Sequence, residues 1–280
     1  MLPPWLVLDP LLLAWLREEW GRGDLTTLGL FGGETPLARA QVLLKEPGVI
    51  CGLSVLARVF TLTTADIQFT PLVAEGTYCA DRTAIARLQG PAPALLMAER
   101  VALNLTQRLS GIATLTRTYV EALQGTTARL TDTRKTTPGL RILEKYATRI
   151  GGATNHRLGL DDAVLLKDNH IQAAGSIHLA LQRIRPRLPH LIAVEVECET
   201  LAQVEEALAC GVDMILLDNM QVDQLRAAVQ FVAGRVPLEA SGNVTLANIA
   251  AVAQTGVDFI ATSAPITRAR WLDISLDFLS

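Results

Sequence analysis

Cationic side chains are concentrated in one stretch of the sequence, between Arg134 and His170, where glycines are also frequent. Arginine pairs bidentately with carboxylate or phosphate, lysine supplies a compact charge, and glycine lets backbone N–H groups approach an oxyanion. The segment can therefore bind several anionic groups together. Its cationic side chains are Arg134, Lys135, Arg141, Lys145, Arg149, His156, Arg157, Lys167 and His170.

From Ala128 onward, short apolar runs alternate with helical stretches, and a polar or charged residue closes each run. This alternation predicts parallel strands connected by helices, in a barrel or an open α/β sheet. In a (β/α) barrel the functional groups cluster at the carboxyl ends of the strands, so we expect the closing residues to face one common mouth. Those residues are Thr131, Lys167, Glu197, Asp218, Ser241 and Ser263.

Position separates the cations expected at the mouth from those expected on a helix surface. Arg134 and Lys135 directly follow the predicted strand 129–132, and Lys167 closes an apolar run, which places all three at strand ends. Helical spacing with an acidic residue nearby indicates a solvated helix face for Arg141, Lys145 and Arg149.

A histidine outside a motif is more often structural than functional, and we interpret His178 and His190 in that way. His156 differs because it directly precedes Arg157 between glycine-rich turns. We therefore expect His156 to belong to the site.

Two carboxylates and one glycine-containing turn complete the predicted mouth. Glu197 and Asp218 each end a hydrophobic strand, which suits Mg²⁺ or a developing positive centre. Pairing of these carboxylates with Lys135 or Lys167 is an equally open interpretation. Ser241-Gly242-Asn243 is expected to open a helix and to offer backbone N–H groups to a phosphate.

The sequence before residue 128 has a different pattern. Short β-rich runs with Gly and Pro between 37 and 89, interrupted by a helical stretch at 54–60, predict a small α+β domain. Helical spacing of apolar residues then predicts a long helix over 94–123. Near the N-terminus, an apolar stretch at 11–16 predicts a packed amphipathic helix after a segment interrupted by Pro3, Pro4 and Pro10.

Bulk composition limits the function classes. The chain has 280 residues, of which 50% are hydrophobic, and this is enough for a large core in one or two domains. A formal net charge of −3 gives no global attraction to nucleic acid or to anionic membranes. The four cysteines lack metal-ligand or disulfide spacing, and the apolar N-terminus lacks a basic leader, so we expect a cytoplasmic protein without a membrane span.

Sequence motifs along nearly the whole chain resemble those of the quinolinate phosphoribosyltransferase family. The matching motifs around the cations are Asp132-Thr-Arg-Lys-Thr-Thr-Pro-Gly-Leu-Arg141, Glu144-Lys145-Tyr146, Gly151-Gly152, Asn155-His156-Arg157, Gly159-Leu160 and Lys167-Asp168-Asn169-His170. The others are Gly23-Asp24-Leu25-Thr26-Thr27, Glu99-Arg100, Ser110-Gly111-Ile112-Ala113-Thr114, Glu195-Val196-Glu197, Leu217-Asp218-Asn219 and Glu239-Ala240-Ser241-Gly242.

The resemblance implies a reaction and a fold. Quinolinate would attack C1 of phosphoribosyl pyrophosphate with Mg²⁺ present and lose pyrophosphate and CO₂, giving nicotinate mononucleotide in the de novo route to NAD. The fold would be α/β, with an N-terminal α/β sandwich domain and a C-terminal incomplete (β/α) barrel. The expected limits are 1–115 for the sandwich, with the tail 271–280 returning to it, and 116–270 for the barrel.

The resemblance also implies roles for individual residues. Quinolinate would be held by Arg134, His156, Arg157 and Lys167, with Arg100 supplied by the second subunit of a homodimer or hexamer. Lys135 would lie between the two substrates. Catalytic roles would fall to Lys135, Glu197 and Asp218, the last two also binding Mg²⁺ and ribose. Phosphate would contact Ser241, Gly242 and Ala264. With no obvious proton-transfer residue, catalysis is expected from positioning and electrostatics.

Asn243, Ala264 and Arg268 depart from the commonest family pattern, in which glycines and a histidine are usual at these places, so phosphate contacts are expected to differ. Similar departures occur in paralogous molybdenum-utilisation proteins, which form an alternative, although the filled quinolinate-binding positions favour the main interpretation. Two further alternatives are an aldolase in which Lys167 forms a Schiff base and a non-enzymatic binding module.

Overall fold

The computed structural model describes residues 2–279, which form two compact units. Within these described residues, the first unit comprises 2–117, 142–151 and 268–279, and the second comprises 118–141 and 152–267. The sequence-based limits stay a prediction; these units differ from them chiefly because 142–151 groups with the first unit. Within the described chain, none of the helices combines the length and apolarity needed to cross a bilayer.

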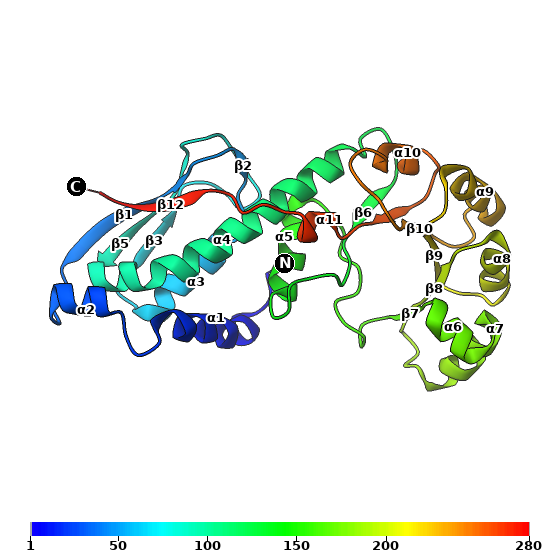
Figure 1. The fold of residues 1–280 in the computed structure, drawn as a ribbon, viewed down its shortest axis with the longest axis horizontal. Helices are drawn as coiled ribbons and strands as arrows, with labels where there is room; N and C mark the ends of the chain where they lie inside the picture. Colours follow the sequence, from blue (N-terminus) through cyan, green and yellow to red (C-terminus); the bar gives the residue numbers. More distant parts are fainter. Residues whose placement is uncertain (1, 280) are drawn as a thin grey trace. The chain divides into compact units, whose positions relative to one another are not determined.

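The first unit contains a four-stranded sheet in the order β12-β1-β5-β3 (Figure 1). Its pairs are antiparallel, and β12 adds the C-terminal segment beside β1. The elements that lie wholly or mainly in this unit are α1 (Trp5–Trp20), α2 (Leu25–Phe31), β1 (Leu37–Leu44), β2 (Gly48–Val49), α3 (Leu53–Thr63), β3 (Gln68–Pro71), β4 (Tyr78–Cys79), β5 (Ala84–Pro91), α4 (Ala92–Glu121), α5 (Arg141–Gly151) and β12 (Ile274–Leu279).

Alternation along β1 explains how the sheet forms a core. Ala40, Val42 and Leu44 are fully buried and lie on one face, as a period of two requires. The long helix predicted from apolar spacing is α4, and Gln107 Nε2 in it donates to the carbonyl oxygen of Ile274 at 2.8 Å. A sheet covered by helices gives this unit its α/β sandwich character.

The N-terminal helix begins earlier than the sequence predicts. Pro10 was expected to interrupt the chain, but it lies inside α1. A proline there removes the N–H that would bond the carbonyl of Leu6. Because Leu6 is 88% exposed, water can satisfy that carbonyl. The buried stripe is Leu8, Leu12 and Leu16, at the i, i+4 spacing of one helix face.

The second unit is built on a six-stranded parallel sheet in the order β6-β11-β10-β9-β8-β7, with helices on one side of the strands (Figure 1). Its elements are β6 (Arg129–Thr131), β7 (Val164–Leu166), α6 (Asp168–Ala174), α7 (Ile177–Ile184), the 3₁₀ helix η1 (Arg185–Arg187), β8 (Val194–Cys198), α8 (Leu201–Ala209), β9 (Met214–Asp218), α9 (Val222–Val232), β10 (Leu238–Ser241), α10 (Ile249–Ala253), β11 (Phe259–Ala261) and α11 (Ala264–Thr267).

This sheet confirms the predicted incomplete (β/α) barrel. Its strands are short, and β7 and β9 consist mainly of Val, Ile and Leu, as expected for parallel strands that are buried on both faces. The predicted strand ends lie within the strands or within two residues of them: Thr131, Asp218 and Ser241 are last residues, and Lys167 directly follows β7. The carboxyl ends of the strands therefore carry the polar residues that the pattern predicted.

Candidate functional site

The carboxyl ends of β7, β8 and β9 bring a lysine and two carboxylates together. Lys167 Nζ contacts Glu197 Oε2 at 3.2 Å, so the pairing that the sequence left open is present. Burial raises the pKa of Glu197; Lys167 opposes this shift, and the negative charge of Asp218 adds to it. The side chain of Lys167 is 44% exposed and paired with a carboxylate, whereas a Schiff-base lysine is activated by burial in an apolar pocket, which counts against the aldolase alternative.

A polar corner lies where β9 and β10 end side by side, with Ser241 in register with Asp218. Asn219 N donates to the carbonyl oxygen of Ser241 at 2.9 Å, and Asn243 Nδ2 donates to Asn219 Oδ1 at 3.0 Å. Gly242, Asn219 and Asn243 all have positive φ, at 92°, 55° and 52°. Such a bent backbone exposes N–H groups of the kind that bind oxyanions.

The prediction that Ser241-Gly242-Asn243 opens a helix is wrong. Ser241 is the last residue of β10, Gly242 and Asn243 form bends, and α10 begins only at Ile249. The positive φ values of Gly242 and Asn243 are incompatible with the first turn of a right-handed helix. Any phosphate contact here would use the bend itself rather than a helix N-terminus.

Arg134 and Lys135 lie in the loop after β6, where Arg134 is half-buried and Lys135 is exposed. Arg157, also half-buried, comes from the turn after the bridge between Thr131 and Thr154. Burial lowers the pKa of Arg157, the positive charge of Arg134 lowers it further, and Glu195 opposes both. Two guanidinium groups close enough to repel each other form a site that gains by binding an anion.

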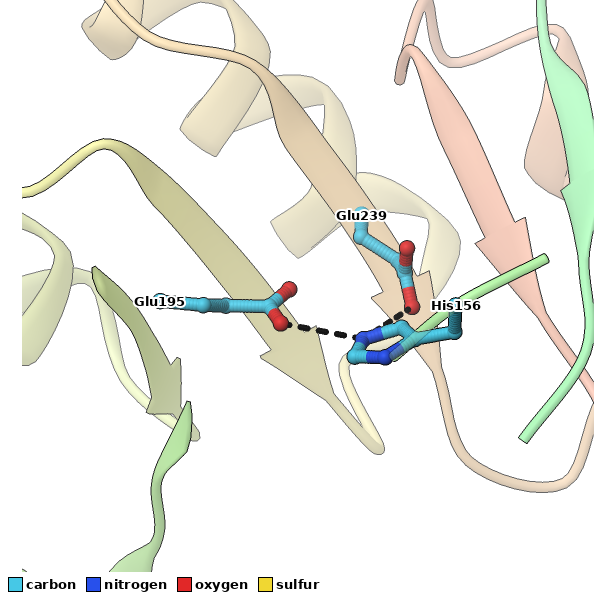
Figure 2. Close-up of side chains that lie close together, drawn as sticks. All are labelled: His156, Glu195 and Glu239. Carbon is cyan, nitrogen blue, oxygen red and sulfur yellow. Dashed lines mark hydrogen bonds and ion pairs between the residues drawn. The ribbon is translucent and has the colours of Figure 1, made fainter. Parts of the chain in front are cut away.

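His156 points toward two carboxylates of the barrel strands (Figure 2). Its Nε2 lies 3.0 Å from Glu195 Oε2 and 3.7 Å from Glu239 Oε1. Its Nδ1 accepts a hydrogen bond from Arg157 N at 2.8 Å. Both ring nitrogens therefore face protein groups, and the implied direct contact of His156 with substrate stays a prediction.

The predicted solvated helix face of α5 needs correction. Lys145 is only 3% exposed, and Glu144 beside it is fully buried. Arg108 Nη2 contacts Glu144 Oε1 at 2.7 Å, so a partner on α4 compensates the charge. Arg149 is exposed as expected, whereas Arg141 is half-buried and donates from Nε to Thr136 Oγ1 at 3.0 Å.

Three further sequence-predicted positions are placed as follows. Arg100 is exposed on α4 of the first unit. Ala264 is 5% exposed and its N–H donates to Thr262 Oγ1 at 3.2 Å. Arg268 is exposed after α11. Their implied roles in binding stay predictions.

Sequence reasoning gave no role to Glu195, Glu239, Asp132 or Asn219. Period-two alternation offered a signal for the two glutamates: Glu195 shares a strand face with Glu197, and Glu239 shares one with Ser241. Asp132 is 2% exposed and accepts hydrogen bonds from Asn155 Nδ2 at 2.7 Å and His156 N at 2.9 Å. No sequence spacing indicated that pairing.

Two domain families cover most of the chain. The family described as quinolinate phosphoribosyl transferase, N-terminal domain, matches residues 24–110. The family described as quinolinate phosphoribosyl transferase, C-terminal domain, matches residues 112–277. The second match includes every site residue above except Arg100, which lies in the first.

Similar proteins and structures agree with these matches. The chain is 54% identical to the probable nicotinate-nucleotide pyrophosphorylase [carboxylating] of Synechocystis sp. over 99% of this chain and 95% of that protein. A crystal structure of NadC from Streptococcus pyogenes is 41% identical, with a TM-score of 0.95 and full coverage of both chains. The nicotinate-nucleotide pyrophosphorylase from Francisella tularensis is 36% identical, with a TM-score of 0.93 and coverage of 99% and 98%.

Proposed function

The chain belongs to the quinolinate phosphoribosyl transferase family, and we propose that it transfers phosphoribosyl from phosphoribosyl pyrophosphate to quinolinate with decarboxylation. The products are nicotinate mononucleotide, pyrophosphate and CO₂, and the reaction belongs to NAD biosynthesis. The enzyme is thus a carboxylating nicotinate-nucleotide diphosphorylase, a pentosyltransferase.

Cationic side chains and a bent polar backbone segment lie at the same end of one sheet, and this arrangement supports the proposed function. Lys167 and the loop cations Arg134 and Arg157 suit the two carboxylates of quinolinate. The corner formed by Ser241 and Gly242 suits a phosphate of the co-substrate. One substrate is a dicarboxylate and the other carries a phosphate and a pyrophosphate, so each anionic group has a matching partner.

The chemistry needs orientation and charge stabilisation. The pyridine nitrogen of quinolinate forms a bond to C1 of the ribose as the bond from C1 to pyrophosphate breaks. The C2–carboxylate bond then breaks, CO₂ leaves, and the electron pair stays on C2 beside the cationic ring nitrogen until C2 takes up a proton. Glu197 and Asp218 are proposed to stabilise the positive charge that develops on the ribose, while Lys135 lies between the substrates.

Mg²⁺ is the proposed metal, and the donor set fits it. Glu197 and Asp218 end neighbouring strands, and their charges influence each other. Two carboxylates at the mouth are oxygen ligands, which a hard cation prefers, and phosphate oxygens usually complete such a site. The ion would neutralise charge on the pyrophosphate.

A direct assay tests the function. Purified protein mixed with quinolinate, phosphoribosyl pyrophosphate and Mg²⁺ is expected to release nicotinate mononucleotide and CO₂ in equal amounts. Chromatography with labelled quinolinate measures both. If neither product forms in the complete mixture, the proposed function is wrong.

Arg134→Ala is expected to weaken quinolinate binding by roughly tenfold to a hundredfold, because one carboxylate loses a charged hydrogen-bonding partner. Binding of nicotinate, which carries a single carboxylate, should weaken much less. Isothermal titration of both ligands measures the difference. Arg149→Ala, which removes an exposed cation of α5, is the control and should change neither affinity. Equal losses for both ligands would refute the assigned role of Arg134.

Assembly as a homodimer, or as a hexamer built from dimers, is proposed with Arg100 reaching the partner's site. Exposed apolar side chains on α2 support a protein partner: Leu25, Leu28 and Leu30 are 87%, 54% and 71% exposed. Arg100 lies in the same unit and is exposed.

The free thiols suit a reducing cytoplasmic location, which is proposed as well.

Mixing an Arg100→Ala protein with a Lys135→Ala protein is expected to restore part of the activity. A hybrid dimer has one site that carries neither change if Arg100 is supplied across the interface. Activity after dissociation and reassociation, compared with each variant treated alone, measures the effect. If the mixture is no more active than the single variants, Arg100 acts in its own chain.

A further inference from the structure

A buried cluster of His156, Glu195 and Glu239 lies among the strands of the second unit (Figure 2). Glu195 and Glu239 are 7% and 1% exposed, and the side chain of His156 is 15% exposed. Within the described structure, neither Glu195 Oε1 nor Glu239 Oε1 has a hydrogen-bond partner. Two buried carboxyl groups with open acceptor atoms beside one imidazole need a compensating proton or cation.

The hydrogen bonds of the His156 imidazole indicate whether a proton or a metal cation compensates the two carboxyl groups. Nδ1 of His156 accepts a hydrogen bond from Arg157 N at 2.8 Å, so that nitrogen carries no proton. The ring proton is then on Nε2, where it is donated to Glu195 Oε2 at 3.0 Å. A metal ion bound at Nε2 would move the ring proton to Nδ1, against the N–H of Arg157. The geometry therefore favours a proton over a metal ion.

The groups around Glu239 favour the acid form of its side chain. Glu195 and His156 face it, Asp132 adds negative charge, and Thr131 from β6 lies beside it. Burial first, then the charge of Glu195 and, least, that of Asp132 raise the pKa of Glu239 to about 8, whereas His156 and the hydroxyl group of Thr131 oppose the shift. At neutral pH Glu239 keeps its proton, and the cluster carries less negative charge than two carboxylates would.

What the cluster fixes is the turn that carries Arg157. Thr154 bridges to Thr131, and Asp132 binds Asn155 Nδ2 and His156 N. The ring of His156 then connects this turn to the barrel strands at Nε2 and to the backbone of Arg157 at Nδ1. Displacement of the ring would thus move the backbone of a cation that faces the substrate.

We infer that Glu195 and the acid form of Glu239 are positioning residues: they hold His156 as its neutral Nε2–H tautomer and thereby place Arg157 for its anionic ligand. The identification of this ligand as quinolinate rests on the proposed function, whereas the tautomer of His156 and the protonation of Glu239 do not. One measurement tests the tautomer, and a second tests whether the cluster positions Arg157.

The first measurement reads the ring directly. Long-range nitrogen–proton spectra of protein labelled with ¹⁵N-histidine contain few signals, because the chain has 4 histidines. His156→Gln identifies the signal. The expected result in metal-free protein is a neutral ring with its proton on Nε2 at neutral pH. An imidazolium, or a ring protonated at Nδ1 that binds added Zn²⁺ or Mn²⁺, would overturn the inference whether or not the protein is active.

The second measurement separates positioning from mere support of the fold. Glu239→Gln imitates the neutral acid, so at neutral pH it should keep the KM for quinolinate within about twofold. Wild-type protein should lose affinity as alkaline pH ionises Glu239, and Glu239→Gln should lose much less. Glu239→Ala should raise the KM by at least about tenfold, with a smaller effect on kcat. Glu205→Gln, an exposed change on α8, controls for the pH series.

An alkaline loss of affinity that is identical in wild-type and Glu239→Gln proteins would overturn the inference. The same holds if Glu239→Ala lowers kcat and leaves the KM unchanged. If wild-type protein has no activity on quinolinate, the proposed function fails, while the histidine spectra still decide the tautomer.

Discussion

Gly242→Ala is expected to lower kcat/KM for phosphoribosyl pyrophosphate by about a hundredfold, the scale that a displacement of about 1 Å causes at a catalytic site. Gly242 has a φ of 92°, a conformation that side chains bearing a Cβ rarely adopt. A methyl group at this position would also come within 2.8 Å of the backbone nitrogen of Asn219. The corner between β9 and β10 must therefore open before alanine fits.

The matched control is Gly211→Ala. Gly211 also has a positive φ, of 65°, but a methyl group there meets nothing within 4 Å. This change should cost about 1 to 3 kcal/mol of stability through backbone strain and leave the kinetics unchanged. Steady-state kinetics with each substrate, together with thermal unfolding, measure both variants. If Gly242→Ala retains wild-type kinetics, the corner formed by Ser241 and Gly242 does not bind the co-substrate.

The strand ends of the barrel could be predicted because local pattern decides them. A short run such as 214–217 is apolar throughout, and the polar residue that follows ends the strand. The register of Ser241 with Asp218 then follows from the parallel arrangement rather than from any property of the two residues. Lys167 and Glu197 were placed at one mouth by the same argument, and their ion pair is observed.

The parts that sequence reasoning missed depend on partners far along the chain. The charges of α5 have the spacing of a solvated helix face, and nothing local indicates that Arg108 meets Glu144 across 36 residues. Glu195 of β8 and Glu239 of β10 both reach His156, whose turn bridges to β6, because one sheet contains all three strands. Local pattern specifies which face a residue takes, but tertiary packing decides what lies opposite that face.

Arg108→Ala is expected to lower the free energy of unfolding of the first unit by about 3 to 5 kcal/mol, because Glu144 stays buried without its guanidinium partner. The two side chains are 16% and 0% exposed, and Arg108 contacts Glu144 Oε1 through Nη2 at 2.7 Å and through Nε at 3.1 Å. Arg226→Ala is the control, because its pair with Asp223 is 50% and 94% exposed and should contribute about 0.5 kcal/mol or less. Chemical denaturation measures both.

A double-mutant cycle identifies the cause of the loss. Adding Glu144→Gln to Arg108→Ala should recover much of the lost stability, because a neutral amide then replaces the buried carboxylate. A loss that is unrelieved in the double variant would mean that Arg108 acts through packing of its side chain, and the buried charge of Glu144 would then be compensated by other groups of the unit.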